Sequence, residues 1–354
     1  MSDRLQDPAG PGIEELDLSL INTLQLDPRA PWSRVGRALD LDPVTVARRW
    51  ARLRDAGTAW VTPQLGPPRS AQVFTALVEV DCEAGRAPEV AGTLATWPHV
   101  VTVEHTSGGR DLMLTVAVPS LSSLSRYLME VLEALPGVRT TRTQLVTRIY
   151  AQGGAWRLRA LDARQRARLA TAGNGHAAAA SRLLTEHDRR LMTRLCVDGR
   201  TSLADLASDT GVSVSTARRR LHALLTSGDL VLRCEVAQPL SGWPVCAGVM
   251  AHVPGDARDI IAQQLAALPE TRLCLAVTGG KANLYYGAWL RSLEDVQQLE
   301  YKLAEQVPRL TILDRVVVLR FVKRMGRILD AAGRSTEVVP MDIWSDPFGP
   351  ANPG

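Results

Sequence analysis

"SVSTARRRLHALLTSG", residues 213–228, has the pattern of a helix with three consecutive arginines at its centre. Apolar residues recur along it at the spacing of one helical face: Ala217, Leu221 and Leu224. Ser213 stands where an N-cap is expected. The opposite face carries two hydroxyls and an arginine, flanked by two more arginines: Ser215, Thr216, Arg219, Arg218 and Arg220. Charged side chains on such a face meet either solvent or a partner of opposite charge.

The same pattern occurs 171 residues earlier, where residues 42–57 have the sequence "DPVTVARRWARLRDAG". No gap is needed to align the two copies from the start of each unit. Identical residues then coincide in pairs: Asp17 with Asp188, Asp27 with Asp198, Arg29 with Arg200, Thr45 with Thr216, Arg48 with Arg219, Arg49 with Arg220, and Gly57 with Gly228. The sequences "SGGR" from Ser107 and "TGGK" from Thr278 coincide at the same offset. The chain is therefore a tandem duplication of a two-part unit.

The first part of each unit is predicted to be a helix-turn-helix. In the first copy, Leu16, Leu20 and Leu24 fit one face of a leading helix, and a short second helix follows. Asp42 is a predicted N-cap with Pro43 at the first helical position of the third helix. We therefore expect winged-helix/helix-turn-helix domains over residues 16–62 and 185–232.

The exposed face of each third helix is the candidate DNA-binding surface. Hydroxyls near the helix N-terminus with arginines one turn later suit the major groove. The predicted DNA-binding residues are Val44, Thr45, Arg48, Arg49, Arg52, Ser215, Thr216, Arg218, Arg219 and Arg220. The alternative is a solvated helix whose arginines pair with nearby aspartates.

The second part of each unit predicts a ferredoxin-like βαββαβ sandwich over residues 72–150 and 243–325. Alternating strand patterns such as "VFTALVEVDC" and "DLMLTVAV" are separated by helical stripes and a glycine turn. The fold class is thus α+β, two helix-turn-helix domains alternating with two sandwiches. Because such a sheet has one face without helices, we expect that face to pair with another sheet.

The remaining segments and the composition bound the function further. We expect a loose N-terminus (1–15), a linker (151–184) with a short basic helix in its middle, and a C-terminal tail (326–354) that orders only if Trp344 docks. The chain of 354 residues has a formal charge of +4 and a pI of about 8.9, which permits nucleic-acid binding. Five scattered cysteines and the absence of apolar runs or a leader predict a cytoplasmic protein without metal, cofactor or membrane span.

The two-part unit resembles the Lrp/AsnC (feast–famine) family of transcription regulators. The matching residues are Asp17, Asp27, Arg29, Arg49, Leu53 and Gly57, the turn "TSGGRDLMLTV", and the segment "LPGVRTTRT". The resemblance implies double-stranded DNA as a partner, no enzymatic activity, and homo-oligomers formed through the sandwiches. It also implies an amino acid or similar effector at the glycine turns, which points to Gly108, Gly109, Asp111, Gly279 and Gly280. In the ungapped alignment Ala282 stands opposite Asp111, so we expect the first copy to be the better effector site.

Two other functions remain open from the sequence. Siroheme decarboxylases resemble the same architecture and rely on histidines, for which His99, His105 and His252 are candidates. However, the segment "RLCLAVTGGKANLYYGAWL" has tyrosines and no histidine, so the sequence lacks the strand rich in histidine and tyrosine that is associated with those enzymes. A third hypothesis is a ligand-sensing scaffold whose helical units do not bind DNA. No arrangement of residues predicts a catalytic nucleophile, a phosphate loop or a metal site.

Overall fold

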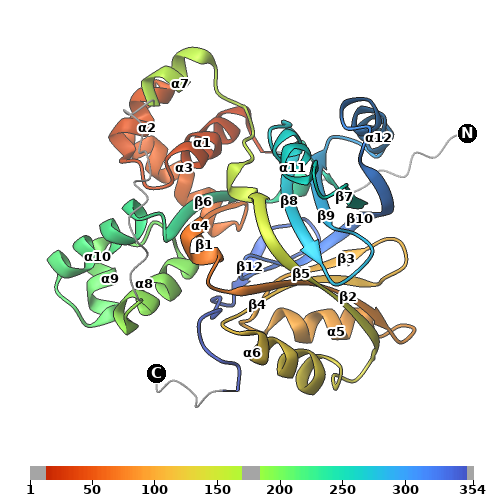
Figure 1. Cartoon of the computed structure of the whole chain (residues 1–354). Helices are drawn as coiled ribbons and strands as arrows, with labels where there is room; N and C mark the ends of the chain where they lie inside the picture. The colour runs from red at the N-terminus through yellow and green to blue at the C-terminus, as the bar shows by residue number, and fades with distance from the viewer. Residues whose placement is uncertain (1–12, 170–183, 349–354) are drawn as a thin grey trace, which may run out of the picture.

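The computed structural model describes residues 13–169 and 184–348 of the chain. Two helical units alternate along the sequence with two sandwich domains (Figure 1). Each helical unit has three helices followed by one strand: α1 (Glu15–Leu26), α2 (Trp32–Leu39), α3 (Pro43–Asp55) and β1 (Ala59–Leu65) in the first copy, and α8 (Glu186–Val197), α9 (Leu203–Thr210), α10 (Val214–Thr226) and β6 (Leu230–Val236) in the second. The predicted helix-turn-helix fold is confirmed in both copies.

The predicted caps and core residues determine where the third helices begin and which face they bury. The Asp42 carboxylate accepts a hydrogen bond from the Val44 N–H at 2.8 Å, and Pro43 occupies the first turn. The Ser213 hydroxyl accepts one from the Thr216 N–H at 3.2 Å. The apolar faces are buried as predicted, through Val46, Trp50 and Leu53 in α3 and Ala217, Leu221 and Leu224 in α10.

The two sandwich domains have the predicted βαββαβ order. In the first copy the elements are β2 (Phe74–Cys82), α5 (Ala87–Ala95), β3 (Val100–Thr106), β4 (Leu112–Val118), α6 (Leu121–Arg126), which continues as π-helical η1 (Tyr127–Leu132), and β5 (Val138–Ala151). In the second copy they are β7 (Val245–His252), α11 (Arg258–Ala266), β8 (Thr271–Thr278), β9 (Leu284–Leu290), α12 (Glu294–Gln306) and β10 (Thr311–Arg324).

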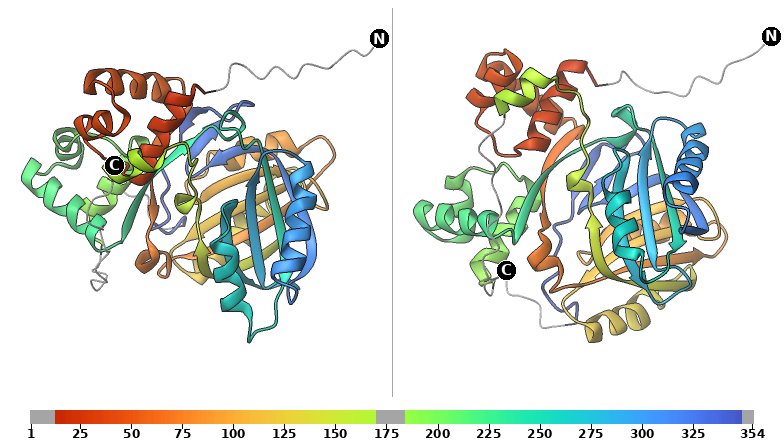
Figure 2. Two further views of the ribbon diagram at one scale, coloured as in Figure 1. Left: turned by 90° about the horizontal axis from the view of Figure 1, so that it is seen from above. Right: turned by 45° about the horizontal axis from the view of Figure 1, so that its top comes forward.

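The two sheets join into one closed ring of eight strands. The last strand of each sandwich is long enough to pair with the other copy: β5 pairs with β8, and β10 pairs with both β3 and β7. The order around the ring is β10-β3-β4-β2-β5-β8-β9-β7 and back to β10. The helices lie outside the ring (Figure 2), so the helix-free faces line its interior. The predicted pairing of helix-free faces therefore occurs within one chain.

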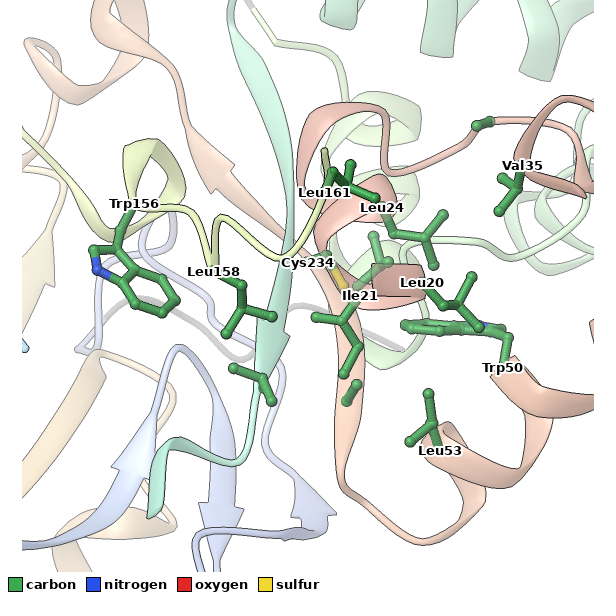
Figure 3. Packing of buried hydrophobic residues seen from close by; sticks show 14 of the residues in the cluster. Leu20, Ile21, Leu24, Val35, Trp50, Leu53, Trp156, Leu158, Leu161 and Cys234 are labelled. Atoms are coloured by element: carbon green, nitrogen blue, oxygen red, sulfur yellow. The ribbon is translucent and has the colours of Figure 1, made fainter. Parts of the chain in front are cut away.

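The described part of the segment between the copies packs on the first helical unit. It contains a 3₁₀ turn, η2 (Gly153–Ala155), and α7 (Ala163–Leu169), the predicted short basic helix. Between them Leu158 and Leu161 pack toward the core of that unit, while Trp156 extends the same cluster to Trp289 of β9, with ring centroids 4.7 Å apart (Figure 3). The Asn22 side chain fixes this segment because its Oδ1 accepts a hydrogen bond from the Ala160 N–H at 2.9 Å. The predicted joint "TAGNGHAAAA" lies outside the described residues.

The described part of the C-terminal tail forms a hairpin on the edge of the sheet. Its strands are β11 (Arg327–Leu329), which pairs with β10, and β12 (Ser335–Val338). The Ser335 N–H donates to the Gly57 carbonyl at 2.8 Å, and a Cβ at Gly57 would lie 2.2 Å from the Ser335 oxygen. Gly57 also has a φ of +64°, so this close approach requires glycine. Trp344 packs against the core of the second helical unit.

Two short elements complete the described part of the chain, α4 (Pro67–Ser70) after β1 and the 3₁₀ turn η3 (Gln238–Leu240) after β6. Among the described residues, no helix combines the length and the apolar character that crossing a bilayer would require.

Candidate DNA-binding and effector sites

The outward faces of α3 and α10 present most of the predicted DNA-binding residues to solvent. Exposed residues on these faces are Val44, Arg48 and Arg52 in α3 and Ser215, Arg218 and Arg219 in α10, while Thr45 and Thr216 are half-buried. Arg48 and Arg219 occupy equivalent positions, and within the described part of the chain neither makes a hydrogen bond or an ion pair. Their guanidinium groups are therefore available to a nucleic acid without loss of an internal contact.

The neighbouring pair, Arg49 and Arg220, faces the first helix of its own unit. Arg49 Nη1 lies 2.8 Å from Glu14 Oε2 and 3.0 Å from Asp17 Oδ1. Arg220 Nη1 lies 3.2 Å from Asp188 Oδ1, the equivalent aspartate. The hydrogen bonds that Arg49 donates to the Glu14 and Asp17 carboxylates raise its pKa. Both arginines therefore fasten the third helix to the first, which is the aspartate pairing that the sequence left open as an alternative.

A reciprocal contact between the copies holds the two helical units together. Arg29 donates to the Gly199 carbonyl at 2.6 Å and to the Thr201 carbonyl at 2.8 Å. Arg200 donates to the Pro28 carbonyl at 2.6 Å and to the Ala30 carbonyl at 2.9 Å. Each arginine thus binds the carbonyls on either side of the other. Burial lowers the pKa of Arg29, and it lowers that of Arg200 to about 10, with the charge of Arg29 acting in the same direction, so Arg200 remains charged at neutral pH.

Two further contacts reinforce this pairing. The guanidinium of Arg200 lies over the Trp32 ring, 3.8 Å from its centroid. Strands β1 and β6 pair antiparallel over seven residues from Ala59↔Val236 to Leu65↔Leu230. The two exposed helix faces are therefore fixed relative to each other within one chain.

The two predicted effector turns each rest on the last strand of the other copy. Gly108 and Gly279 have φ values of +98° and +104°, which favour glycine. The Ser107 N–H donates to the Val317 carbonyl at 2.9 Å, and a Cβ on Gly279 would lie 3.1 Å from the Thr143 oxygen. The turns therefore lie at contacts between the sandwiches, as the family resemblance implied.

The structure corrects the alignment at Asp111. Its carboxylate accepts a hydrogen bond from the Cys82 N–H at 2.7 Å. In the second copy the equivalent N–H, that of Val253, donates to Asn283 Oδ1 at 2.9 Å. The second turn has one extra residue, Ala282, so the residue equivalent to Asp111 is Asn283. The ungapped alignment that placed Ala282 opposite Asp111 was wrong because it could not show a one-residue insertion inside a turn.

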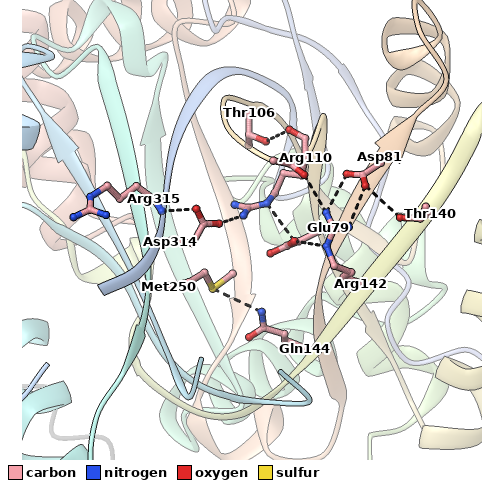
Figure 4. A network of polar contacts seen from close by, with 11 residues as sticks. Glu79, Asp81, Thr106, Arg110, Thr140, Arg142, Gln144, Met250, Asp314 and Arg315 are labelled. Atoms are coloured by element: carbon pink, nitrogen blue, oxygen red, sulfur yellow. Dashed lines mark hydrogen bonds and ion pairs between the residues drawn. The ribbon is translucent and has the colours of Figure 1, made fainter. Parts of the chain in front are cut away.

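A charged network surrounds the first turn (Figure 4). Arg142 Nε lies 3.0 Å from Glu79 Oε2, and its terminal nitrogens bind both oxygens of Asp81. Arg110 Nε lies 3.3 Å from Glu79 Oε2 and also contacts Asp314 of the second copy. The hydrogen bond from Arg142 lowers the pKa of Asp81. Carboxylates and guanidinium groups at one place can recognise the ammonium and carboxylate of an amino acid.

The equivalent residues around the second turn are different in character. Met250 and His252 replace Glu79 and Asp81, and Lys281 replaces Arg110. The predicted effector residues Gly279 and Gly280 therefore lie in a less charged surrounding than Gly108 and Gly109. Within the described residues no group of three or more His, Cys, Asp or Glu side chains could hold a metal ion.

Sequence reasoning missed the reciprocal arginine contact and the charged network. The signal for the first was present, since Asp27 and Arg29 recur as Asp198 and Arg200. The groups that accept hydrogen bonds from Arg29 and Arg200 are backbone carbonyls, which every residue has, so the sequence does not indicate them. The network draws on strands that are distant along the chain, so no local motif marks it.

Comparison with known proteins identifies both parts of the unit. The model of the AsnC-type helix-turn-helix domain matches residues 13–54 and 184–225, and the model of the Lrp/AsnC ligand binding domain matches residues 75–156. The HTH-type transcriptional regulator FL11 of Pyrococcus horikoshii is 28% identical over 141 residues, 40% of this chain and 93% of that protein. The leucine-responsive regulatory protein of Escherichia coli K12 is 29% identical over 142 residues, 39% of this chain and 86% of that protein.

Solved structures of a siroheme decarboxylase are similar over most of the chain. The siroheme decarboxylase NirDL in complex with an iron-uroporphyrin III analogue is 16% identical, with a TM-score of 0.56 over 88% of this chain and 93% of that chain. At this identity the similarity concerns the fold alone.

Proposed function

We propose that this chain binds double-stranded DNA as a one-chain pseudo-dimer. It belongs to the Lrp/AsnC family of DNA-binding transcriptional regulators, with two copies of the helix-turn-helix domain in one chain. The observation that carries this proposal is the fixed pairing of the two helical units through Arg29, Arg200 and the β1–β6 ladder. A homodimer achieves such pairing with two chains, whereas here one chain holds two reading helices.

The two helices offer different side chains to the DNA, so the two half-sites should be unequal. Val44 in α3 can only pack against a thymine methyl, whereas Ser215 in α10 can hydrogen-bond a base edge. In a homodimer of identical helices the operator is palindromic. We propose that palindromy arises here only over a longer site bound by two chains.

A footprint in which every operator base pair is substituted in turn tests this proposal. We expect different base preferences in the two halves of the minimal site. Exchanging residues 43–54 for 214–225 should convert one half-site preference into the other. A site that tolerates exchange of its halves without loss would show that the copies bind alike.

We also propose that an amino acid or related small molecule binds at the first glycine turn, near Gly108, Gly109 and Asp111. The charged network around that turn and its position between the sandwiches support this proposal. Calorimetric titration with an amino-acid panel should detect binding. Asp111→Asn is the most informative variant, because the asparagine oxygen can still accept a hydrogen bond from the Cys82 N–H and only the negative charge is removed. The second copy has this arrangement already, since Asn283 accepts a hydrogen bond from the Val253 N–H.

Assembly and location follow from the same proposal. Because the helix-free sheet faces meet within one chain, homo-oligomers would form through other surfaces of the sandwich domains. A DNA-binding regulator works where the genomic DNA is, so we place this protein in the cytoplasm. Light scattering of the purified chain measures the oligomeric state.

The fold similarity to NirDL favours a second candidate function, a siroheme-decarboxylase-like enzyme. The histidine positions favour the regulator. His99 Nε2 is 2.9 Å from the Ser345 carbonyl oxygen, while His105 and His252 are exposed and pair with β10 at Arg320 and Thr311. They do not converge on one site. Ultraviolet–visible spectra of the protein with siroheme test the enzyme, and gel shifts with genomic fragments test the scaffold that does not bind DNA.

A further inference from the structure

The closed ring of strands encloses a cavity that none of the sites above uses. The volume of this cavity that the centre of a water-sized sphere can occupy is about 200 Å³, and one side of the cavity is open to solvent. Strands of both copies form its wall, and Met192 and Cys196 of α8 also contribute to the lining. The glycine turns and Asp111 do not line it, and neither does any histidine of the described residues. The cavity is therefore separate from the proposed effector site.

Most of the cavity wall is apolar. Apolar side chains from β5, β8, β9 and β10 contribute to it: Val146, Ile149, Leu273, Leu275, Trp289 and Phe321. Such a wall excludes a small hydrated ion as the natural occupant, because an ion would lose its water shell without replacement. It suits the apolar body of an organic molecule.

A cationic cluster interrupts this apolar wall. Arg233, Arg272 and Arg324 all line the cavity, and Glu235 pairs with all three. Arg272 Nη2 lies 2.6 Å from Glu235 Oε2, and Arg324 Nη2 lies 3.1 Å from the same oxygen. Burial alone would raise the pKa of Glu235, but the three guanidinium groups outweigh it and lower the pKa to about 2. The cluster therefore has three positive charges against one negative charge.

Arg324 has hydrogen-bonding capacity that the protein does not use. Its Nη2 donates to the Val236 carbonyl at 2.7 Å, while its buried Nε and Nη1 have no hydrogen-bond acceptor among the described residues. The guanidinium also lies 5.2 Å from the centroid of the Trp289 ring. The side chain is 5% exposed. Buried donors without an acceptor are unfavourable, and an anion is the acceptor that a guanidinium binds best.

The other carboxyl group of the lining does not neutralise the cluster fully. Burial raises the pKa of Glu104 to about 7, with Arg324 acting in the opposite direction. At neutral pH and below, Glu104 is therefore protonated to a large extent, and the cavity keeps its positive charge.

We propose that this cavity is a second ligand site, which binds an organic anion whose acidic group accepts hydrogen bonds from Arg324 and whose apolar body lies against the strand side chains. A carboxylic or sulfonic acid with an aromatic or alicyclic body has this chemistry. The proposal does not depend on DNA binding, and its test needs no DNA.

A pair of fluorescent probes separates the acidic group from the apolar body. 8-Anilinonaphthalene-1-sulfonate is an apolar anion, and N-phenyl-1-naphthylamine has the same aromatic skeleton without charge. In titrations of the full chain we expect one sulfonate probe to bind per chain. Arg324→Met should weaken its binding about 10- to 100-fold, as expected for lost hydrogen bonds to a charged group, and leave the neutral probe nearly unchanged.

Two matched controls and one filling variant complete the experiment. Gly287 lines the cavity, and a Cβ there would only touch Leu273 and Tyr285, at 3.5 Å and beyond, so Gly287→Leu should fill the cavity and weaken both probes. Gly92→Leu, on the exposed surface of α5, and Arg139→Met, on the exposed surface of β5, should change neither. Circular dichroism checks folding, and Gly287→Leu decides the location of binding if Arg324→Met does not fold.

Two outcomes would overturn the proposal. Sulfonate binding that survives Gly287→Leu would place the probe outside the cavity. Equal weakening of both probes by Arg324→Met would show that the arginine does not bind the anionic group.

Discussion

Replacing Arg29 or Arg200 with methionine tests whether the reciprocal contact holds the two helical units as one body. Each substitution removes two hydrogen bonds from a charged donor, at 2.6 and 2.8 Å for Arg29 and at 2.6 and 2.9 Å for Arg200. Such bonds contribute about 1.5–3 kcal/mol each. Burial of each guanidinium costs free energy, as its lowered pKa shows, and this cost offsets part of the free energy that the hydrogen bonds contribute. We therefore expect each single variant to lose about 2 kcal/mol of unfolding free energy.

The double variant should lose less than the sum of the two single variants. Arg29 binds carbonyls on either side of Arg200, and Arg200 binds carbonyls on either side of Arg29. Either substitution thus loosens the loop that positions the remaining arginine. For residues coupled in this way we expect an interaction energy of about 1 kcal/mol.

Urea unfolding followed by circular dichroism measures all four proteins of this cycle. Arg139→Met is the control, since Arg139 is exposed and makes no hydrogen bond among the described residues. Additive losses, within about 0.5 kcal/mol, would show that the two loops act independently. Losses no larger than that of the control would refute the structural role of the contact.

Three further predictions concern DNA, effector and pH. Arg48→Ala and Arg219→Ala should each weaken operator binding by about 1–3 kcal/mol in gel shifts, and wild-type affinity in the double variant would contradict the recognition assignment. Asp111→Asn should weaken effector binding in calorimetry about tenfold, whereas equal affinity would exclude its charge from the site. Because burial raises the pKa of Glu104 to about 7, deprotonating it costs more in the folded chain, so unfolding free energy should fall as pH rises from 5 to 8. In urea unfolding this fall should exceed that of Glu104→Gln by about 2 kcal/mol, and equal pH slopes would contradict it.

The sequence predicted those parts of the fold that depend on local pattern. The periodicity of Val46, Trp50 and Leu53 identified α3, the Ser213 cap identified the start of α10, and the strand alternation gave the order βαββαβ. Each of these helices and strands is at most 14 residues long, so its pattern can be read from neighbouring residues. The offset between the copies doubled the evidence for each of them.

The parts that the sequence did not predict depend on contacts between the copies. The pairing of β5 with β8 and of β10 with β3 joins strands that are more than a hundred residues apart. The sequence of a strand does not specify which distant strand it will pair with. The sequence placed Arg49 and Arg220 beside the DNA-binding face. The structure adds the duplicated aspartates Asp17 and Asp188 as their partners, and a DNA contact by either arginine stays a prediction.

The duplication itself explains how the cationic cluster of the cavity can exist. Thr62 and Arg233 occupy equivalent positions in the two copies, and they are also direct partners in the β1–β6 ladder. A local two-fold axis therefore passes between them. In a dimer of identical chains the residue at this position would face itself, and an arginine there would lie against a second arginine in a buried place.

Fusion of the copies removes this constraint. The equivalent of Arg272 is Val101, the equivalent of Glu235 is Gln64, and Gln64 Oε1 accepts a hydrogen bond from Arg233 at 2.9 Å. The second copy thus supplies the charges of this cluster, and the first copy supplies neutral partners of fitting shape. Two such clusters facing each other across an axis would bring six guanidinium groups to two carboxylates. One cluster leaves room and a net positive charge for an anion, an arrangement that a symmetric dimer of identical chains cannot have.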